Sequence, residues 1–354
     1  MYTDTDIDGA VERGIFTPAA ATAFRTYVSG QRHTSLVDEE HFRLITGFND
    51  IFVTIAAVLL LAAVAWIGHA IPFVRAIEGP SLLSGLFVAI AAWGLAEFFT
   101  RKRRMALPSI VLLLAFAGGV FVTMIAAVGN GNHEGFDRGV ALMLSLVTAV
   151  TAAATWLHWR RFHVPITVAA GTLALVGLAI GLLLAAIPVM GDWLYAVLLM
   201  TGIAVFAFAM RWDMSDPTRT TRRSDVAFWL HLLAAPLIVH PIFALLGLLD
   251  GGANVGEAAV VLALYVMMGL VAIAVDRRAL LVSALAYVLY ALSTLFREFG
   301  AVSLNLALTA LVIGSALLLL SAFWHSVRIR VLAMLPVDLR HRLPNSDQGL
   351  AAST

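Results

Sequence analysis

Two histidines and two prolines lie within one apolar stretch of the chain, residues 225–243. His231 and His240 carry ionisable rings, and an ionisable side chain at membrane depth is costly and marks a functional position. Pro236 and Pro241 lack a backbone N–H, so each frees a carbonyl oxygen that another group must satisfy. These four residues are therefore the first candidates for a polar pathway or gate.

The spacing of the two histidines limits what they can do together. They are nine positions apart, which places their side chains on opposite faces of an ideal helix unless the prolines bend it. Three interpretations remain: each ring makes a hydrogen bond between helices, the rings line a path for a solute or proton, or they bind a metal. No carboxylate lies between or beside them, and no H-E-x-x-H motif is present. We therefore expect neither a metal site nor a catalytic residue pair.

Other polar residues lie where apolar segments begin or end, and these are candidates for the mouth of such a pathway. They are Asn49, Asp50, Glu97, Arg297, Glu298 and Asn305. Some have an ordinary structural interpretation: Asn49 or Asp50 can cap a helix, and Glu97 can pair with the arginine cluster that begins at Arg101. No aspartate or glutamate lies near the middle of an apolar segment, which argues against a pump driven by a buried carboxylate.

The segments that carry these residues indicate an all-α integral membrane protein. Of the 354 residues, 61% are hydrophobic and 13% are charged, whereas an average soluble domain has about 25% charged residues. A helix needs roughly 17–25 apolar residues to cross a bilayer core, and Gly177-x-x-x-Gly181 is typical of closely packed membrane helices. The sequence predicts ten such helices between residues 49 and 324, over 50–70, 80–100, 106–128, 138–157, 164–187, 192–211, 225–248, 257–275, 279–296 and 303–324.

The distribution of basic residues predicts the orientation of these helices. Cytoplasmic loops of membrane proteins carry an excess of lysine and arginine. If both termini are cytoplasmic, 20 of the 23 basic residues lie on the cytoplasmic side, and only Arg75, Arg138 and Arg297 lie outside. We therefore expect ten helices with both termini inside. The tail, residues 325–354, is expected to be basic and amphipathic and then disordered.

Residues 1–48 form a separate polar segment before the first apolar helix. Thr17 and Pro18 are typical of a helix start, since threonine caps a helix and proline suits its first position. Gly14 is typical of a helix end. The sequence thus predicts a small cytosolic or interfacial hairpin of two helices, over about 6–13 and 18–28, followed by a third polar segment.

A pattern in this hairpin resembles a known family. Residues 10–21 read A-x-x-x-G-I-F-T-P-x-A-A and precede the first apolar helix. This is similar to the hairpin A-x-x-x-G-x-I-x-x-x-Q-A at the N-terminus of a family of bacterial multi-spanning membrane proteins, although the glutamine is absent here. The similarity covers about the first 70 residues. The resemblance implies a polytopic protein of a bacterial inner membrane and implies no particular activity.

Two classes of function remain after these observations. The chain has no cysteine, no phosphate-binding glycine motif and no G-x-S-x-G, so we expect no enzyme, no cofactor and no nucleic-acid partner. One hypothesis is a transporter or permease for a small solute or lipid, with the histidine and proline segment as its gate. The alternative is a non-transporting scaffold, assembly or stress protein that docks a partner protein through the N-terminal hairpin. Both place the lipid bilayer around residues 49–324.

Overall fold

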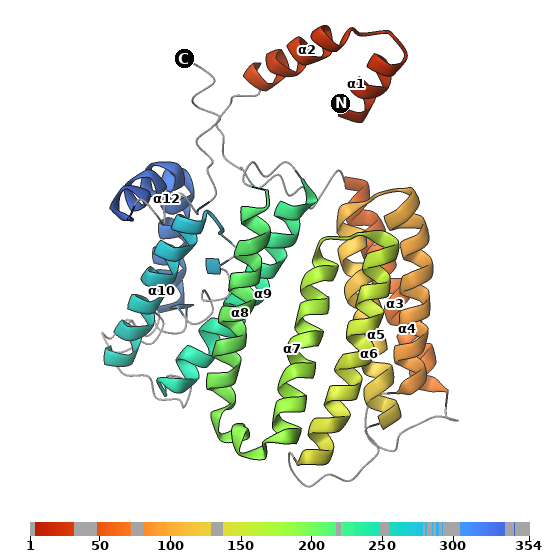
Figure 1. The fold of residues 1–354 in the computed structure, drawn as a ribbon, viewed down its shortest axis with the longest axis vertical. Helices are drawn as coiled ribbons and strands as arrows, with labels where there is room; N and C mark the ends of the chain where they lie inside the picture. Colours follow the sequence, from red (N-terminus) through yellow and green to blue (C-terminus); the bar gives the residue numbers. More distant parts are fainter. Residues whose placement is uncertain are drawn as a thin grey trace. The chain divides into compact units, whose positions relative to one another are not determined.

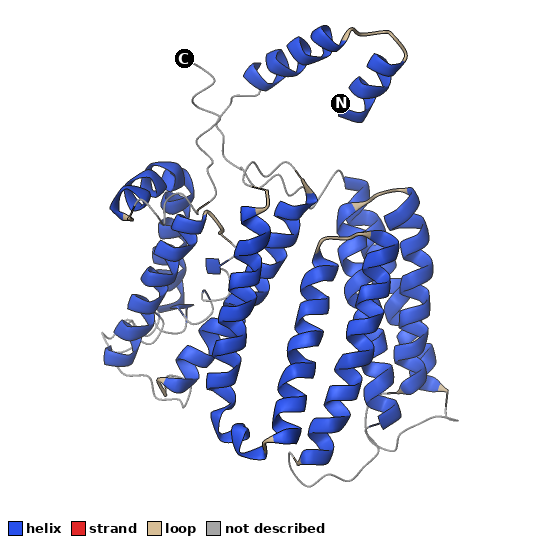
Figure 2. Cartoon of the chain, in the orientation of Figure 1, coloured by secondary structure: helices blue, strands red, loops and turns tan. Residues whose placement is uncertain are grey.

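The computed structural model describes residues 4–31, 48–71, 81–128, 137–216, 221–247, 255–278 and 305–336, with a few positions between 280 and 292 and residue 343. All regular structure in this part of the chain is helical (Figure 2). The elements are α1 (Asp4–Glu12), α2 (Pro18–Gln31), α3 (Phe48–Ala70), α4 (Leu82–Ala96), the π-helix η2 (Glu97–Lys102), α5 (Ala106–Val128), α6 (Arg138–Phe162), α7 (Ile166–Ala186), the 3-10 helix η3 (Pro188–Trp193), α8 (Leu194–Met214), α9 (Arg222–Leu245), α10 (Val255–Val275) and α12 (Asn305–Met334).

Seven stretches of helix in the described residues are long and apolar enough to cross a membrane. They are Asn49–Ala70, Leu82–Lys102, Ala106–Val128, Arg138–Phe162, Ile166–Ala186, Pro188–Met214 and Arg222–Leu245. An eighth candidate is α12, in which Leu308–Trp324 and Ser326–Met334 meet at a bend of 77°. The expected all-α fold, with several helices that could span a membrane, is therefore confirmed for this part of the chain. Of the other expected segments, 257–275 corresponds to α10, whose apolar part is the shorter Ala259–Val275, and 279–296 falls largely outside the described residues.

The chain divides into two compact units, residues 1–41 and 42–354. The first unit contains the hairpin of α1 and α2. Gly14 ends α1 with a φ of +70°, a conformation that glycine adopts at little cost. The Oγ1 atom of Thr17 accepts a hydrogen bond from the N–H of Ala20 at 3.1 Å, as expected of a helix cap. Helix α2 extends to Gln31 rather than to about Val28.

In the second unit, helices α3 to α9 pack mainly against their neighbours in the chain (Figure 1). Small residues allow the backbones to approach. A Cβ added to Gly181 of α7 would collide with Ser145 Oγ of α6, and one added to Gly177 would lie 2.9 Å from a methyl carbon of Thr148. The Gly177-x-x-x-Gly181 motif therefore forms a close contact between α6 and α7, as such motifs do in membranes.

Helix α9 is continuous from Arg222 to Leu245 although it contains two prolines. Pro241 has no N–H to donate to the carbonyl of Leu237, which lies one turn earlier. That carbonyl faces the backbone of α8, because a Cβ at Gly202 would lie 2.7 Å from the carbon and oxygen of the Leu237 carbonyl. The close approach of a glycine covers the freed carbonyl and brings α8 directly against α9.

Candidate functional site

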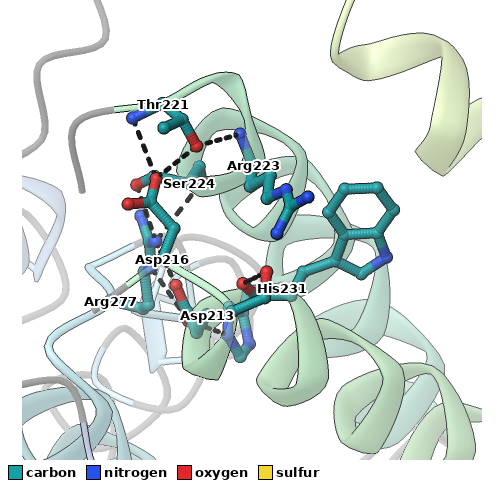
Figure 3. Close-up of polar contacts among 9 residues, drawn as sticks. Asp213, Asp216, Thr221, Arg223, Ser224, His231 and Arg277 are labelled. Carbon is teal, nitrogen blue, oxygen red and sulfur yellow. Dashed lines mark hydrogen bonds and ion pairs between the residues drawn. The ribbon is translucent and has the colours of Figure 1, made fainter. Parts of the chain in front are cut away.

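A buried ionic network joins Asp213, His231 and Arg277 (Figure 3). The Nε2 atom of His231 donates to Asp213 Oδ2 at 2.8 Å, and the Nε atom of Arg277 donates to the same oxygen at 3.2 Å. Arg277 Nη2 donates to the other carboxylate oxygen and, at 3.1 Å, to the hydroxyl of Ser224. None of the three charged or ionisable side chains is more than 1% exposed. The carboxylate of Asp213 is therefore the centre of the network.

Helices α8 and α9 supply two of these groups because of how the loop between them is built. Asp213 lies in the last turn of α8. In the loop that follows, Asp216 Oδ2 accepts hydrogen bonds from the N–H and the hydroxyl of Thr221, at 2.9 and 2.7 Å, and Thr221 caps α9 (Figure 3). Ser224 and His231 are seven residues apart, so they share one face of α9. This face is turned toward the end of α8.

Arg277 is positioned by a tight turn at the end of α10. Asp276 has a φ of +59°, and the N–H of Arg277 donates to the carbonyl of Ala272 at 2.8 Å while the N–H of Asp276 donates to that of Ile273. These are the bonds of a Schellman motif, which usually has glycine in the left-handed position. The Asp276 carboxylate also accepts a hydrogen bond from Trp324 Nε1 at 2.7 Å. Helix α12 thus fixes the turn that directs Arg277 toward Asp213.

The network can hold three segments of the chain together, and we call Asp213, His231 and Arg277 the latch. Ser224 lies about 10 Å from His231 along the axis of α9, so the serine and histidine do not form a nucleophile and base, which must be within hydrogen-bond reach. The charges of Asp213 and Arg277 are instead removed from water and paired, and removing either partner leaves the other charge uncompensated. Because the groups come from α8, α9 and the turn after α10, these segments separate only if the bonds to Asp213 and the bond from Arg277 to Ser224 break.

The four residues first proposed as a gate do not lie together. His231 is fully buried in the network, whereas His240 is exposed and its ring lies 6.0 Å from that of Tyr195 on α8. Pro236 is exposed and Pro241 is buried. The separation of the rings agrees with their spacing of nine residues in a helix that remains continuous. Only His231 therefore belongs to the buried network.

The candidate mouth residues lie on other helices or outside the described residues. Glu97 accepts hydrogen bonds from the Nε and Nη2 atoms of Arg161 at 2.7 and 3.0 Å, and from Arg101 at 3.2 Å. Asn49 is exposed and Asp50 is buried in the first turn of α3. Arg297 and Glu298 lie outside the described residues, and so does the side chain of Asn305, which begins α12. The helices that carry Asn49, Asp50 and Glu97 pack mainly against each other and α5.

A second buried histidine has a structural environment. His158 of α6 is enclosed by the rings of Trp93, Phe116 and Phe162, with ring centroids 4.6–6.0 Å from its own. Its Nδ1 atom lies 3.3 Å from the hydroxyl of Thr167. These contacts join α4, α5, α6 and α7 in one aromatic cluster, so we assign His158 to the core. Within the described residues, no three His, Asp or Glu side chains are grouped so that they could hold a metal ion.

A cavity of about 180 Å³ lies between α10, α12 and the residues that follow Arg277. It is lined by Tyr265, Arg278, Leu281, Leu285, Leu317, Leu320, Ser321 and Trp324. Arg278 is the only charged residue among these lining residues of the described chain, and its guanidinium carbon lies 5.0 Å from the centroid of the Trp324 ring. Arg278, which lines the cavity, thus directly follows Arg277 of the latch in the sequence.

Sequence reasoning did not find Asp213, Arg277 or the cavity. The predicted sixth helix ends at residue 211, which placed Asp213 in a loop, and Arg277 was assigned to a cytoplasmic turn. No carboxylate lies between or beside the two histidines in the sequence, yet His231 has an acidic partner, Asp213, which comes from the preceding helix. The signal available in the sequence was the spacing of Ser224 and His231, which are seven residues apart and therefore place two polar side chains on one face of the helix. No protein-family model, curated protein or solved structure matches the chain.

Proposed function

We propose that this protein is a transporter or permease for a small solute or lipid in a bacterial inner membrane, with ten helices and both termini in the cytoplasm. In this proposal the network of Asp213, His231 and Arg277 is the cytoplasmic gate. His240 and Pro241 lie near the opposite end of α9. The gate opens when the turn after α10 moves away from the ends of α8 and α9.

The observation that carries the proposal is the complete burial of this network beside a cavity. Buried ion pairs contribute little net stability compared with apolar packing, so a static bundle gains little from placing three such groups here. Ionisable residues within membrane segments mark pathways and gates. The network also joins three separate segments: Asp213 of α8 accepts bonds from His231 and Arg277, and Arg277 also donates to Ser224 of α9. The segments therefore separate only when these bonds break together.

Cysteine accessibility tests the gate without knowledge of the solute. The chain contains no cysteine, so one introduced thiol reports without background. Ala227 is fully buried on α9, between Ser224 and His231. In membrane vesicles, the Ala227→Cys variant is expected to react slowly with a maleimide added on the cytoplasmic side. Adding Asp213→Asn is expected to accelerate the reaction at least tenfold, because it weakens the bonds that hold the gate shut.

Ala92 of α4 supplies the matched control. It is also fully buried, but it lies in the hydrophobic cluster of α4 and α5. The Ala92→Cys variant should remain unreactive with and without Asp213→Asn, which excludes general unfolding as the cause. If Ala227→Cys is as unreactive as Ala92→Cys in both backgrounds, the helices form a static bundle and the transporter proposal is rejected.

The N-terminal hairpin favours a second candidate, a scaffold that docks a partner protein. Ile15 is 68% exposed and Phe16 is 40% exposed, and the ring of Phe16 stacks on that of Phe24 with centroids 6.4 Å apart. Exposed apolar clusters mark interaction sites. Deleting residues 1–34 should then leave membrane insertion intact but fail to complement a strain that lacks the gene. Full complementation by the truncated chain would remove the basis of this candidate.

A further inference from the structure

We propose that η2 and the end of α6 together form a binding site for the headgroup of an anionic phospholipid. Six exposed basic side chains lie there: Arg101, Lys102, Arg103, Arg104, Arg160 and Arg161. All six are within two residues of the end of Leu82–Lys102 or of Arg138–Phe162, which are long and apolar enough to cross a membrane. In a bilayer these cations therefore lie at the level of the headgroups. The site goes beyond the proposed transport and does not depend on the opening of the latch.

Glu97 brings the basic residues of η2 and α6 together. Its carboxylate accepts hydrogen bonds from Nε and Nη2 of Arg161, at 2.7 and 3.0 Å, and from Nη1 of Arg101 at 3.2 Å. Within the described residues, no other carboxylate forms a salt bridge with any of the six cations. Six positive charges and one negative charge leave this surface with a net charge of +5. The surface is therefore complementary to an anion.

Two of the arginines are held against exposed aromatic rings. The guanidinium carbon of Arg103 lies 5.5 Å from the centroid of the Phe98 ring, and that of Arg160 lies 5.1 Å from the Trp156 ring. Such stacking orders a guanidinium that would otherwise move freely in solvent. An ordered guanidinium can donate two parallel hydrogen bonds to a phosphate group. One arginine of this kind is present on each of the two segments.

The same rings favour a lipid over a free phosphate ion. Phe98 is 44% exposed and Trp156 is 58% exposed, and the neighbouring Leu157 is 53% exposed. Exposed aromatic rings are typical of the membrane interface, where one end of the ring meets the headgroups and the other meets the acyl chains. An anionic phospholipid can pair its phosphate with the arginines and place its acyl chain against these apolar side chains. A free phosphate ion uses only the charges.

The backbone between α4 and α5 is also unusual at the basic residues. The N–H of Arg103 donates to the carbonyl of Phe98, and the N–H of Met105 donates to that of Phe99, at 3.0 and 3.1 Å. These wide turns are typical of π-helices, which are frequent at functional sites. Arg104 has a φ of +53°, a conformation that glycine adopts at lower cost. Orientation in a membrane requires positive charge in this turn but does not require arginine in this conformation.

Native mass spectrometry of the full chain in detergent tests the site. The chain is titrated separately with dilauroyl phosphatidylglycerol, which is anionic, and with dilauroyl phosphatidylcholine, which is zwitterionic and has the same acyl chains. We expect the anionic lipid to bind about tenfold more tightly. Arg103→Gln combined with Arg160→Gln should remove this preference, because each basic residue contributes to the attraction of an anionic lipid. Arg103→Lys with Arg160→Lys should weaken binding several-fold, because lysine keeps the charge but lacks the planar, two-pronged donor.

Arg222→Gln combined with Arg223→Gln is the matched control. It also removes two exposed arginines from a helix end, the start of α9, and should leave the lipid preference unchanged. Equal affinity for the two lipids, or an equal loss in both glutamine variants, overturns the site. Full affinity in the lysine variant overturns the role of the stacked guanidinium groups. Displacement of the lipid by excess glycerol 3-phosphate would show a site for soluble phosphate and overturn the assignment to a lipid.

Discussion

Removing Asp213 should destabilise the protein far more than removing a surface charge. In Asp213→Ala, Arg277 keeps its position at 1% exposure but loses the carboxylate that accepts two of its hydrogen bonds. Breaking a buried pair from one side costs about 3–5 kcal/mol, because the remaining charge is uncompensated. Arg277→Met should cost a similar amount, since it leaves the carboxylate buried with His231 alone. The free energy of unfolding in mixed detergent and SDS micelles measures both.

The double variant distinguishes a pair from two independent contributions. Once Asp213 and Arg277 are both replaced, no uncompensated charge of the pair remains. Its cost should therefore be smaller than the sum of the two single costs by about 0.5–3 kcal/mol, the range of coupling between groups in direct contact. Arg330→Gln on α12 serves as the control, because this arginine is exposed.

Two results would refute this reasoning. If Arg277→Met is as mild as Arg330→Gln, the guanidinium of Arg277 is not held in the buried network. If the effects of Asp213→Ala and Arg277→Met are additive, the two side chains do not interact in the folded protein. In either case the latch has no physical basis.

Three further expectations follow from the contacts. His231→Phe should lower the free energy of unfolding by about 1.5–3 kcal/mol, the value of a hydrogen bond to a charged group. A loss as large as that in Asp213→Ala would show that the ring does more than donate to the carboxylate. Gly181→Leu should lower the free energy of unfolding by about 1–3 kcal/mol through overpacking. In the same assay Gly94→Leu should be tolerated, because a Cβ added at Gly94 meets no atom within 4 Å. In intact vesicles, impermeant maleimide should label Ser215→Cys only from the cytoplasmic side and Val189→Cys only from the opposite side, and labelling of both from one side would contradict the proposed topology.

Hydrophobic segments and caps were predictable because they depend on local sequence. The boundaries of α3 and α5 differ from the expected ones by at most two residues, since a long apolar run can satisfy its backbone in a membrane only as a helix. The Thr17 cap and the Gly14 helix end were equally local. The hairpin and the long apolar helices of the second unit, residues 42–354, could therefore be located without any knowledge of packing.

The buried network was not predictable, because its parts are distant in the chain. Asp213 and Arg277 are 64 positions apart, and no periodic pattern relates an acid at the end of one helix to an arginine after another. Arginines in a cytoplasmic turn follow the positive-inside rule, so that rule explained Arg277 before its partner was known. Burial distinguishes Arg277 from the other arginines that this rule was used to place: Arg277 is 1% exposed, whereas the Arg161 side chain is 42% exposed.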